Sequence, residues 1–463
     1  MVSGRRFRGG DEQVGTVQIT SWDGGILQVS VPMDPPLRQV NSYILPDGEG
    51  GITVIDPGPH SAETEQAWQQ VLQELNLVWT QIREVVVTHH HPDHYGLAGW
   101  MQERSGCLVR MTERAHAEAS WMWGAGPPAG LDKGIDGRGP AVGEASGNLP
   151  KYAEGSSGAD AGIDAGIWSN LGLSFSGSDA ASCGSGYGYD EAADGGTDCG
   201  YAGAAGKESE GGYAGAAGRE NEGGYAGLVG KESKDRFAGA AGRLPGINEV
   251  LPRFFASHGM PEHLASEIRG HLESFLPQVT PQPGVTYLHP EAPLRMGGRD
   301  WLPLITGGHA PGHVSLYHAA SGQLICGDAV LPQISPNVSL LPGSDPQPLL
   351  TFLEGLRCLR SYPVSMAFPG HREPFSGFTA RVDSLLRHHE ERLQQAEALL
   401  AAGPLSGFAV CEALFRGRVT SVHQLRFAMS EALAHLAELV RQERAVLTES
   451  SSGILFAAAP LPG

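Results

Sequence analysis

The sequence predicts an α/β fold that carries a disordered glycine-rich insertion and a helical C-terminal appendage. Three observations lead to this prediction. Strand-like and helix-like segments alternate over residues 16–123 and return over 247–378, which we take as one domain. Between them, residues 124–246 are rich in glycine, alanine, serine and acidic residues. The apolar pattern of residues 379–463 is mainly helical, so the 463-residue chain divides into three parts.

The first part contains expected strands and helices separated by turn signals. The segments GILQVSVPM, VNSYILPD, GITVIDPG and IREVVVT are expected to be strands. The segment SAETEQAWQQVLQELNL is expected to be an amphipathic helix with Ser61 as its N-cap. A second helix, from about Asp93 to Ser105, should end at Gly106.

The insertion contains a repeat whose aromatic residues, Tyr201, Tyr213, Tyr225 and Phe237, are 12 positions apart. A glycine-rich unit of this length is compatible with a solenoid turn. However, its few apolar side chains cannot offset the entropy lost when so much glycine is ordered. The composition therefore favours a disordered acidic insertion.

Order returns after the insertion. The segment INEVLPRFFASHGMPEHLASEIRGHLESFL looks helical, and WLPLITGG, HVSLYHA, QLICGDAVL and VSMAFPG look like strands. The C-terminal region should be helical and end in a small hairpin within AVLTESSSGILFAAA. Helices followed by a terminal β-wing suggest a winged-helix-like region.

Composition narrows the range of partners. A formal net charge of -19 argues against broad nucleic-acid binding but leaves room for a local basic groove. The six cysteines are scattered with no CxxC pair, which favours a reducing cytoplasm. No apolar run reaches the roughly 18 residues of a membrane span, and the N-terminus shows no signal-peptide pattern. We therefore expect a cytoplasmic protein with no membrane partner.

The stretch VVVTHHHPDHYG, residues 85–96, places four histidines and an aspartate directly after an apolar run. In extended backbone, alternate residues share a face, so His89, His91 and Asp93 can converge while His90 points away. After Pro92 a helix would turn His94 in another direction. One loop could thus serve two metal ions, and imidazole with carboxylate suits zinc, with iron and manganese as alternatives. The other interpretation is a histidine-rich surface loop.

Further residues of the metal-binding type stand at the ends of other expected strands, and they favour a metal site. They are Asp56 in VIDPG, His309 and His313 in TGGHAPGHVSLYH, Asp328 in LICGDAVL, and His371 in AFPGHREPF. A site built on a sheet edge requires this placement.

In these motifs the sequence resembles the metallo-β-lactamase superfamily, and within it the glyoxalase-II-like branch. The THxHxDHxG motif is matched by residues 88–96, and the later motifs follow in family order. The resemblance covers about residues 20–120 and 284–375. It implies an αββα fold, in which two sheets pack face to face between helices.

The resemblance also implies a ligand set for two zinc ions. One ion would be held by His89, His91 and His313, and the other by Asp93, His94 and His371. Asp328 would bridge the two, and Asp93 and Asp328 would be the catalytic carboxylates. Asp56 would fix a ligand histidine or the loop from behind, and His309 is expected to support the ligands without being one.

The implied activity is hydrolysis of a small ester, thioester or lactone by a hydroxide that two metal ions activate. The substrate would be a small molecule, as for a hydroxyacylglutathione-hydrolase-like thioesterase. One alternative is a phosphodiesterase or ribonuclease, for which a basic stripe could come from Arg381, Arg387, Arg392, Arg416, Arg418 and Arg426. A second is a di-iron oxidoreductase, but such relatives carry glutamate at the position of His91 and a flavodoxin-like domain.

Overall fold

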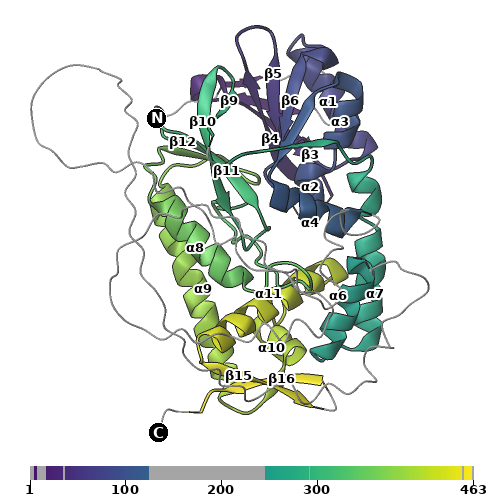
Figure 1. The fold of residues 1–463 in the computed structure, drawn as a ribbon, viewed down its shortest axis with the longest axis vertical. Helices are drawn as coiled ribbons and strands as arrows, with labels where there is room; N and C mark the ends of the chain where they lie inside the picture. The colour runs from purple at the N-terminus through teal and green to yellow at the C-terminus, as the bar shows by residue number, and fades with distance from the viewer. Residues whose placement is uncertain are drawn as a thin grey trace, which may run out of the picture. The chain divides into compact units, whose positions relative to one another are not determined.

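In the computed structural model, two large β-sheets lie in the upper part of the view in Figure 1, above the C-terminal helices. The structure describes residues 5–7, 17–34, 37–124, 246–290, 292–450 and 453–460. The expected insertion therefore lies outside the described residues, apart from its two edges.

The first sheet has eight strands in sequence order. Neighbours are antiparallel from β1 to β5 and parallel from β5 to β8. Its strands are β1 (Arg5–Phe7), β2 (Gln18–Ser21), β3 (Leu27–Pro32), β4 (Gln39–Pro46), β5 (Ile52–Ile55), β6 (Ile82–Val86), β7 (Leu108–Met111) and β8 (Val285–Tyr287).

The second sheet has five strands in the order β13-β12-β11-β10-β9. All neighbours are antiparallel except β12 and β13, which are parallel. Its strands are β9 (Leu294–Met296), β10 (Arg299–Thr306), β11 (His313–His318), β12 (Gln323–Gly327) and β13 (Met366–Pro369).

The apolar residues of the strands fill two separate cores. Along β4, Tyr43 and Leu45 belong to a cluster that also contains Trp301 and Phe368 of the second sheet. Ile44, between them, belongs to the larger cluster shared with the helices. The strands are therefore covered on both faces, which explains their continuous apolar runs. The αββα prediction is confirmed.

The helices on the first sheet begin and end at residues that stabilise their termini. Helix α1 (Ala62–Glu74) is capped by Ser61, whose hydroxyl accepts a hydrogen bond from the Thr64 amide, as the sequence predicts. The expected helix before Gly106 is split into α2 (Pro92–Tyr95) and α3 (Ala98–Ser105). Gly106 ends α3 with a φ of 72°, a conformation that glycine adopts without strain.

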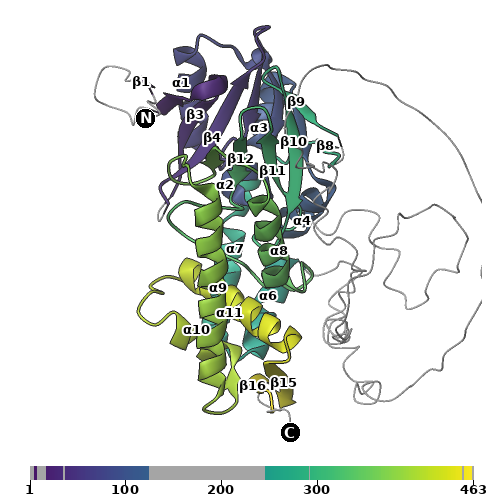
Figure 2. The same cartoon turned by 90° about the vertical axis from the view of Figure 1, so that its left-hand side faces the viewer.

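The sequence does not predict two of the helices. They are α4 (Glu113–Trp123) and α8 (Pro348–Arg360), and α8 packs on β10 and on α9 (Phe378–Leu400). Figure 2 shows α8 and α9 side by side. The sequence indicates only strands in the region that precedes β13, so this part of the prediction is incomplete.

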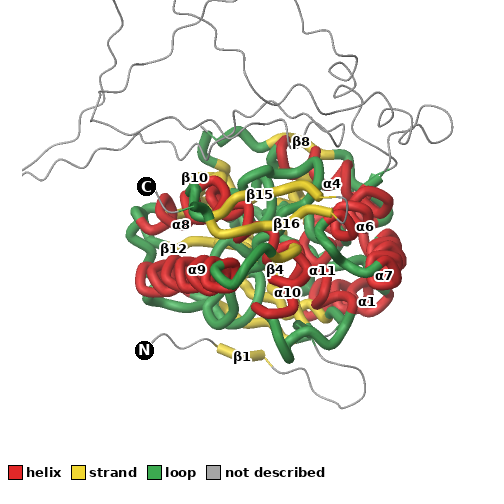
Figure 3. Tube along the Cα trace, turned by 90° about the horizontal axis from the view of Figure 1, so that it is seen from below, coloured by secondary structure: helices red, strands yellow, loops and turns green. Residues whose placement is uncertain are grey.

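The C-terminal region surrounds one buried helix. Helix α11 (Val422–Arg441) contacts α7 (Glu262–Glu273), α8, α9 and α10 (Gly407–Leu414), while α6 (Ile247–Ser257) packs on α7. Strands β15 (Ala445–Ser450) and β16 (Gly453–Ala458) form the expected hairpin, which β14 (Leu405–Ser406) extends (Figure 3). Among the described helices, none combines the length and apolar character needed to cross a bilayer.

Candidate metal centre

The loop after β6 is fixed by one carboxylate at the end of the neighbouring strand. Asp56 Oδ1 accepts a hydrogen bond from the Thr88 amide at 2.7 Å, and Oδ2 accepts one from the Thr88 hydroxyl at 2.7 Å. Oδ2 also lies 2.9 Å from His94 Nδ1. Since β5 and β6 are parallel, their carboxyl ends meet at the same edge of the sheet, and Asp56 reaches the histidine loop from there.

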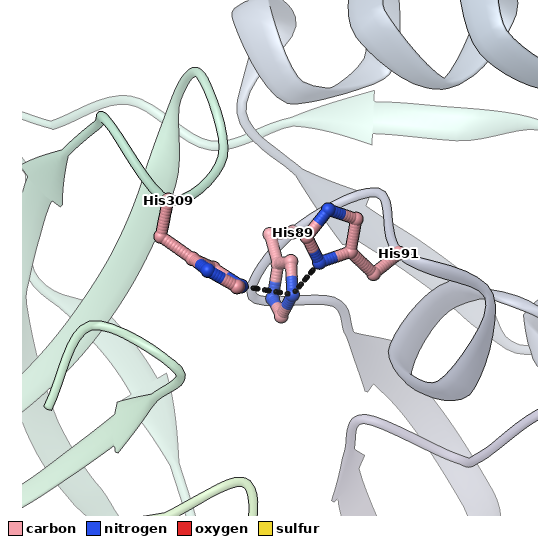
Figure 4. A group of neighbouring side chains, drawn as sticks. All are labelled: His89, His91 and His309. Carbon is pink, nitrogen blue, oxygen red and sulfur yellow. Dashed lines mark hydrogen bonds between the residues drawn. The ribbon is translucent and has the colours of Figure 1, made fainter. Parts of the chain in front are cut away.

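Three histidines converge on one side of this loop (Figure 4). His89 Nε2 lies 3.0 Å from His91 Nδ1 and 3.4 Å from His309 Nε2. His309 comes from the segment between β10 and β11, so the two sheets supply opposite sides of the group. Neutral imidazole nitrogens that face one another at these distances need a shared proton or cation between them.

The third histidine of this group differs from the one that the sequence indicates. The sequence predicts His313 as the ligand and His309 as a supporting residue. In the structure both ring nitrogens of His313 have other contacts: Nε2 accepts from the Asp328 amide at 3.2 Å, and Nδ1 lies 3.4 Å from the Thr306 hydroxyl. His313 holds Asp328 in place, and His309 presents Nε2 to His89.

A second group gathers around Asp328 at the end of β12. Its Oδ2 lies 3.6 Å from His94 Nε2, 3.6 Å from His309 Nε2 and 3.5 Å from His371 Nε2. His371 Nε2 is also 3.1 Å from Asp93 Oδ2. Asp93, His94 and His371 form a third candidate group, which shares His94 with the group of His89, His94 and Asp328. Asp328 therefore touches residues of both ends of the site.

Three of the converging histidines are tied through their other nitrogen. His94 Nδ1 faces Asp56, His309 Nδ1 donates to the Asn337 carbonyl at 2.8 Å, and His371 Nδ1 donates to the Gln39 carbonyl at 3.1 Å. These bonds fix the tautomer and leave the Nε2 lone pair directed at the centre. Such an arrangement is typical of histidines that ligate metal ions.

His90 has a different environment. It is 2% exposed, both of its ring nitrogens lack a hydrogen-bond partner, and it belongs to none of the three candidate groups in the described part of the chain. Burial lowers the pKa of His90 to about 3, so the ring is neutral at physiological pH. This position of His90 agrees with the expectation from strand alternation that its side chain points away from His89, His91 and Asp93.

The charges of the centre support one another. Burial opposes ionisation of Asp328, yet His371 and His94 hold its pKa well below the usual range. Burial likewise opposes the charge on His94, but Asp328, Asp93 and Asp56 raise its pKa well above the usual value. For His89 burial dominates, and the neighbouring histidines lower its pKa further. The carboxylates of the site are thus ionised and favour positive charge at His94, whereas His89 stays neutral.

Several features fit divalent metal ions. His94 Nε2 and Asp328 Oδ1 are buried atoms for which no hydrogen-bond partner is found in the described chain. Gly370 lets the two approach, because a Cβ there would lie 2.3 Å from Asp328 Oδ1 and 2.5 Å from the His94 ring. Imidazole and carboxylate are ligands that zinc, iron and manganese accept.

The sequence does not reveal one supporting residue. Asn337 holds His309 through its backbone carbonyl, and its side-chain amide donates to the Phe427 carbonyl at 3.2 Å and to Glu431 at 2.9 Å. Both partners belong to α11. A backbone acceptor leaves no signature in sequence, so only the structure reveals that the C-terminal region supports a histidine of the centre.

Comparisons with known proteins agree with this geometry. The family model of the metallo-beta-lactamase superfamily matches residues 35–188 and 241–371, and that of the metallo-beta-lactamase-like C-terminal domain matches residues 393–458. A probable metallo-hydrolase of Bacillus subtilis (strain 168), YqjP, is 30% identical over 151 residues. That match covers 32% of this chain and 47% of the relative, so the chain spans about half of the relative's length.

Two solved structures share the fold over almost the whole chain. One is a metallo-beta-lactamase family protein of Thermus thermophilus, with 22% identity, a TM-score of 0.60, and coverage of 94% of this chain and 98% of that one. The other is a beta-lactamase domain protein of Burkholderia ambifaria, with 22% identity, a TM-score of 0.63, and coverage of 96% and 94%. Because the family model matches more than half of this chain, the chain belongs to the metallo-beta-lactamase superfamily.

Proposed function

We propose that the protein is a metal-dependent hydrolase with a dinuclear centre, acting on a small ester, thioester or lactone. The observation that carries the proposal is the convergence of three overlapping histidine and aspartate groups around Asp328. The name of the Bacillus subtilis relative, a probable metallo-hydrolase, supports the reaction class.

His89, His91 and His309 would hold one ion, and Asp93, His94 and His371 the other, with Asp328 between them. Two divalent ions supply an activated water and polarise the oxygen of the scissile bond. We propose zinc as the native metal, as the mixture of imidazole and carboxylate ligands suggests.

The chain's own residues would orient the ligands and admit the substrate. Asp56, Asn337 and Gln39 hold three histidine rings in one tautomer. The Asp93 side chain keeps 18% of its surface exposed, whereas that of Asp328 keeps 8%. A substrate would therefore enter on the Asp93 side, and Asp93 is placed to accept a proton there.

The ribonuclease alternative receives less support from the arginines. Arg392 and Arg426 are 7% and 8% exposed, and Arg381 donates to the carbonyls of Leu331 and Ile334. Three of the six arginines that could have formed a basic stripe are thus directed inward. A groove that follows a phosphate backbone needs its cations at the surface.

Three finer features remain proposals. We propose that α10, α11 and the β15–β16 hairpin form a winged-helix-like unit, because helices followed by a hairpin are typical of it. We also propose the glyoxalase-II-like branch, on the motifs of residues 88–96 and 306–313. We propose a cytoplasmic location because Cys107, Cys326 and Cys411 are free thiols.

Elemental analysis and a substrate panel test the proposed function. After mild dialysis, each chain should retain close to two transition-metal ions, by analogy with dinuclear sites. The zinc-loaded protein should hydrolyse thioesters or lactones with a higher kcat/KM than phosphodiesters, and chelation should abolish the reaction.

Asp328→Asn is the sharpest variant, because a neutral amide bridges two cations poorly, and it should lower kcat/KM by orders of magnitude. The matched control is His318→Asn, which replaces a half-exposed histidine of β11 that lies outside the candidate groups. Full activity with less than one ion per chain would contradict the dinuclear proposal.

A further inference from the structure

Arg426 is a buried cation for which no ion pair is found among the described residues. It is 8% exposed, and its Nε is buried with no hydrogen-bond partner among the described residues. Burial lowers the pKa of Arg426 to about 10, and the guanidinium stays charged at neutral pH. Buried charges in proteins are normally paired, so this one needs an explanation.

A nearby arginine shows the usual solution. Arg392 is also buried, but its Nη1 donates to the Leu414 carbonyl at 3.2 Å, and Glu431 is close enough to raise its pKa against the effect of burial. Arg381 likewise donates to two carbonyl oxygens. The same region of the protein therefore gives its other inward-facing arginines oxygen acceptors, whereas the Nε of Arg426 finds none among the described residues.

Aromatic rings surround the Arg426 guanidinium. Its Cζ lies 4.2 Å from the ring centre of Phe427 and 5.6 Å from that of Phe275. His423 lies 4.8 Å from Phe427 and 6.3 Å from Phe275, between ring centres, and its Nδ1 is 3.1 Å from His271 Nε2. We call these four residues (His271, Phe275, His423 and Phe427) the aromatic wall.

Residues of the aromatic wall connect with a support of the centre, with the histidine loop and with the charge of Asp93. Phe427 is joined to His309 through Asn337. Phe275 lies 6.1 Å from Trp123, whose Nε1 donates to the His90 carbonyl at 2.8 Å. His423 is close enough to Asp93 for that carboxylate to act on its charge. Arg426, which packs on Phe427 and Phe275, therefore lies among the side chains around the centre.

Arg426 provides the positive charge of this wall. Burial, together with Arg426, lowers the pKa of both His271 and His423 to about 4, so both rings are neutral at physiological pH. All four wall residues are half-buried and reach solvent. The wall thus combines partly exposed rings with one buried guanidinium.

We propose that Arg426 binds an anionic group of the substrate, a carboxylate or a phosphate, while the aromatic wall holds the apolar part beside it. The inference rests on the proposed hydrolase function and names the class of substrate. Guanidinium pairs with either anion through two parallel N–H donors and also stacks on aromatic rings. A single enclosed cation suits one terminal anionic group better than a chain of phosphates.

The kinetic test compares two thioesters of the same thiol, butyryl and succinyl, which differ by one terminal carboxylate. The zinc-loaded wild type should prefer the succinyl compound. Arg426→Met should lower kcat/KM for it by about ten- to a hundredfold, the usual effect of losing a charge-assisted hydrogen bond. Hydrolysis of the butyryl compound should change by less than about twofold. Arg426→Lys keeps the charge and should recover part of the preference.

The matched control is Arg416→Met, which removes the same charge from an exposed residue shortly before α11. It should leave both substrates unaffected. If the anionic preference persists in Arg426→Met, or if both substrates lose activity equally, Arg426 does not recognise the anion and the inference fails.

Thermal unfolding provides a readout that does not depend on hydrolysis. Removing an unpaired buried charge should keep or raise the Tm of Arg426→Met, whereas loss of a structural arginine would lower it. Benzoate or inorganic phosphate should raise the Tm of wild type more than that of the variant, and the better of the two identifies the anion. If neither thioester is hydrolysed but this difference is found, the proposed reaction fails and the anion site stands. If neither anion distinguishes the two proteins, the anion site fails.

Discussion

At the scale of single residues, Asp56 shows how one carboxylate organises a reactive loop. Its backbone has a φ of 54°, in the left-handed region that aspartate tolerates better than most residues. From this position it accepts hydrogen bonds from the amide and the hydroxyl of Thr88 and faces His94 Nδ1. Thr88 in turn joins the second sheet, because its carbonyl accepts from the Val314 amide at 3.0 Å. The unusual backbone is thus stabilised by the contacts that orient the ligands.

His309 and His313 should behave differently when each is replaced. His309→Ala removes an Nε2 that faces His89 and Asp328, so we expect the loss of about one metal ion per chain and of most activity. His313→Ala removes the acceptor of the Asp328 amide, so its main effect should be a loss of stability of about 1–3 kcal/mol. Metal analysis and urea unfolding of both variants would check this. If His313→Ala lost the metal while His309→Ala kept it, the assignment from the sequence motif would be right.

The strand-end position of the site residues was predictable, but the role of each was not. The motif of residues 88–96 and the isolated Asp328 and His371 all lie where the sequence predicts them, at the ends of β6, β12 and β13. The segment from His309 to His313 contains two histidines four apart, and spacing alone cannot say which one faces the centre. That depends on the turn at Gly312, whose φ is 69°, and on Thr306 and Asp328, which engage His313.

At the scale of elements, α11 connects the C-terminal region with the metal centre. Residues 428–436 of this helix are all buried, and its Ser430 carbonyl accepts from the Leu340 amide at 3.1 Å. Together with Asn337, this contact fixes the segment that orients His309. The apolar period of the sequence predicts α11. It does not reveal α8, because that segment lies between predicted strands and begins with a proline, which a helix accepts at its first turn.

Glu431 on α11 should make stability depend on pH. Burial raises its pKa to about 6, more than Arg392 and the hydrogen bond from Asn337 lower it. Since the folded state holds this proton more tightly than the unfolded chain, the free energy of unfolding should fall as pH rises from about 4.5 through 6 to about 7, by about 2 kcal/mol in all. Glu431→Gln keeps the acceptor for Asn337 but cannot ionise, so its free energy of unfolding should not fall in this way.

Urea unfolding at pH 4.5 and pH 7 measures this effect. Relative to wild type, the free energy of unfolding of Glu431→Gln should be higher at pH 7 than at pH 4.5 by about 2 kcal/mol. Glu412→Gln, at an exposed position on α10, is the control and should show no such shift. A difference for Glu431→Gln that does not change with pH would contradict the prediction.

At the scale of the whole molecule, one hydrophobic cluster continues from the helices of the first sheet into the C-terminal helices. It includes Trp68 of α1, Trp123 of α4, Phe255 of α6 and Leu433 of α11. The strand patterns and the family resemblance predicted the two sheets, but not that the C-terminal helices would support His309, because contacts so distant in sequence leave no local pattern.

The glycine-rich segment between α4 and α6 should be dispensable for this packing. Trp123 and Ile247, the buried residues on its two sides, both belong to the continuous cluster, and the family model leaves residues 189–240 unmatched. Its glycine-rich composition offers few apolar side chains, and the length of such a connection changes stability only slowly. Replacing residues 130–240 by a short Gly/Ser linker should therefore preserve metal content and kcat/KM within about twofold, with a Tm within a few degrees of wild type. A second variant keeps the segment's length and composition but scrambles its order. If the linker variant loses solubility or bound metal and the scrambled variant loses them too, the repeat sequence itself takes part in the fold.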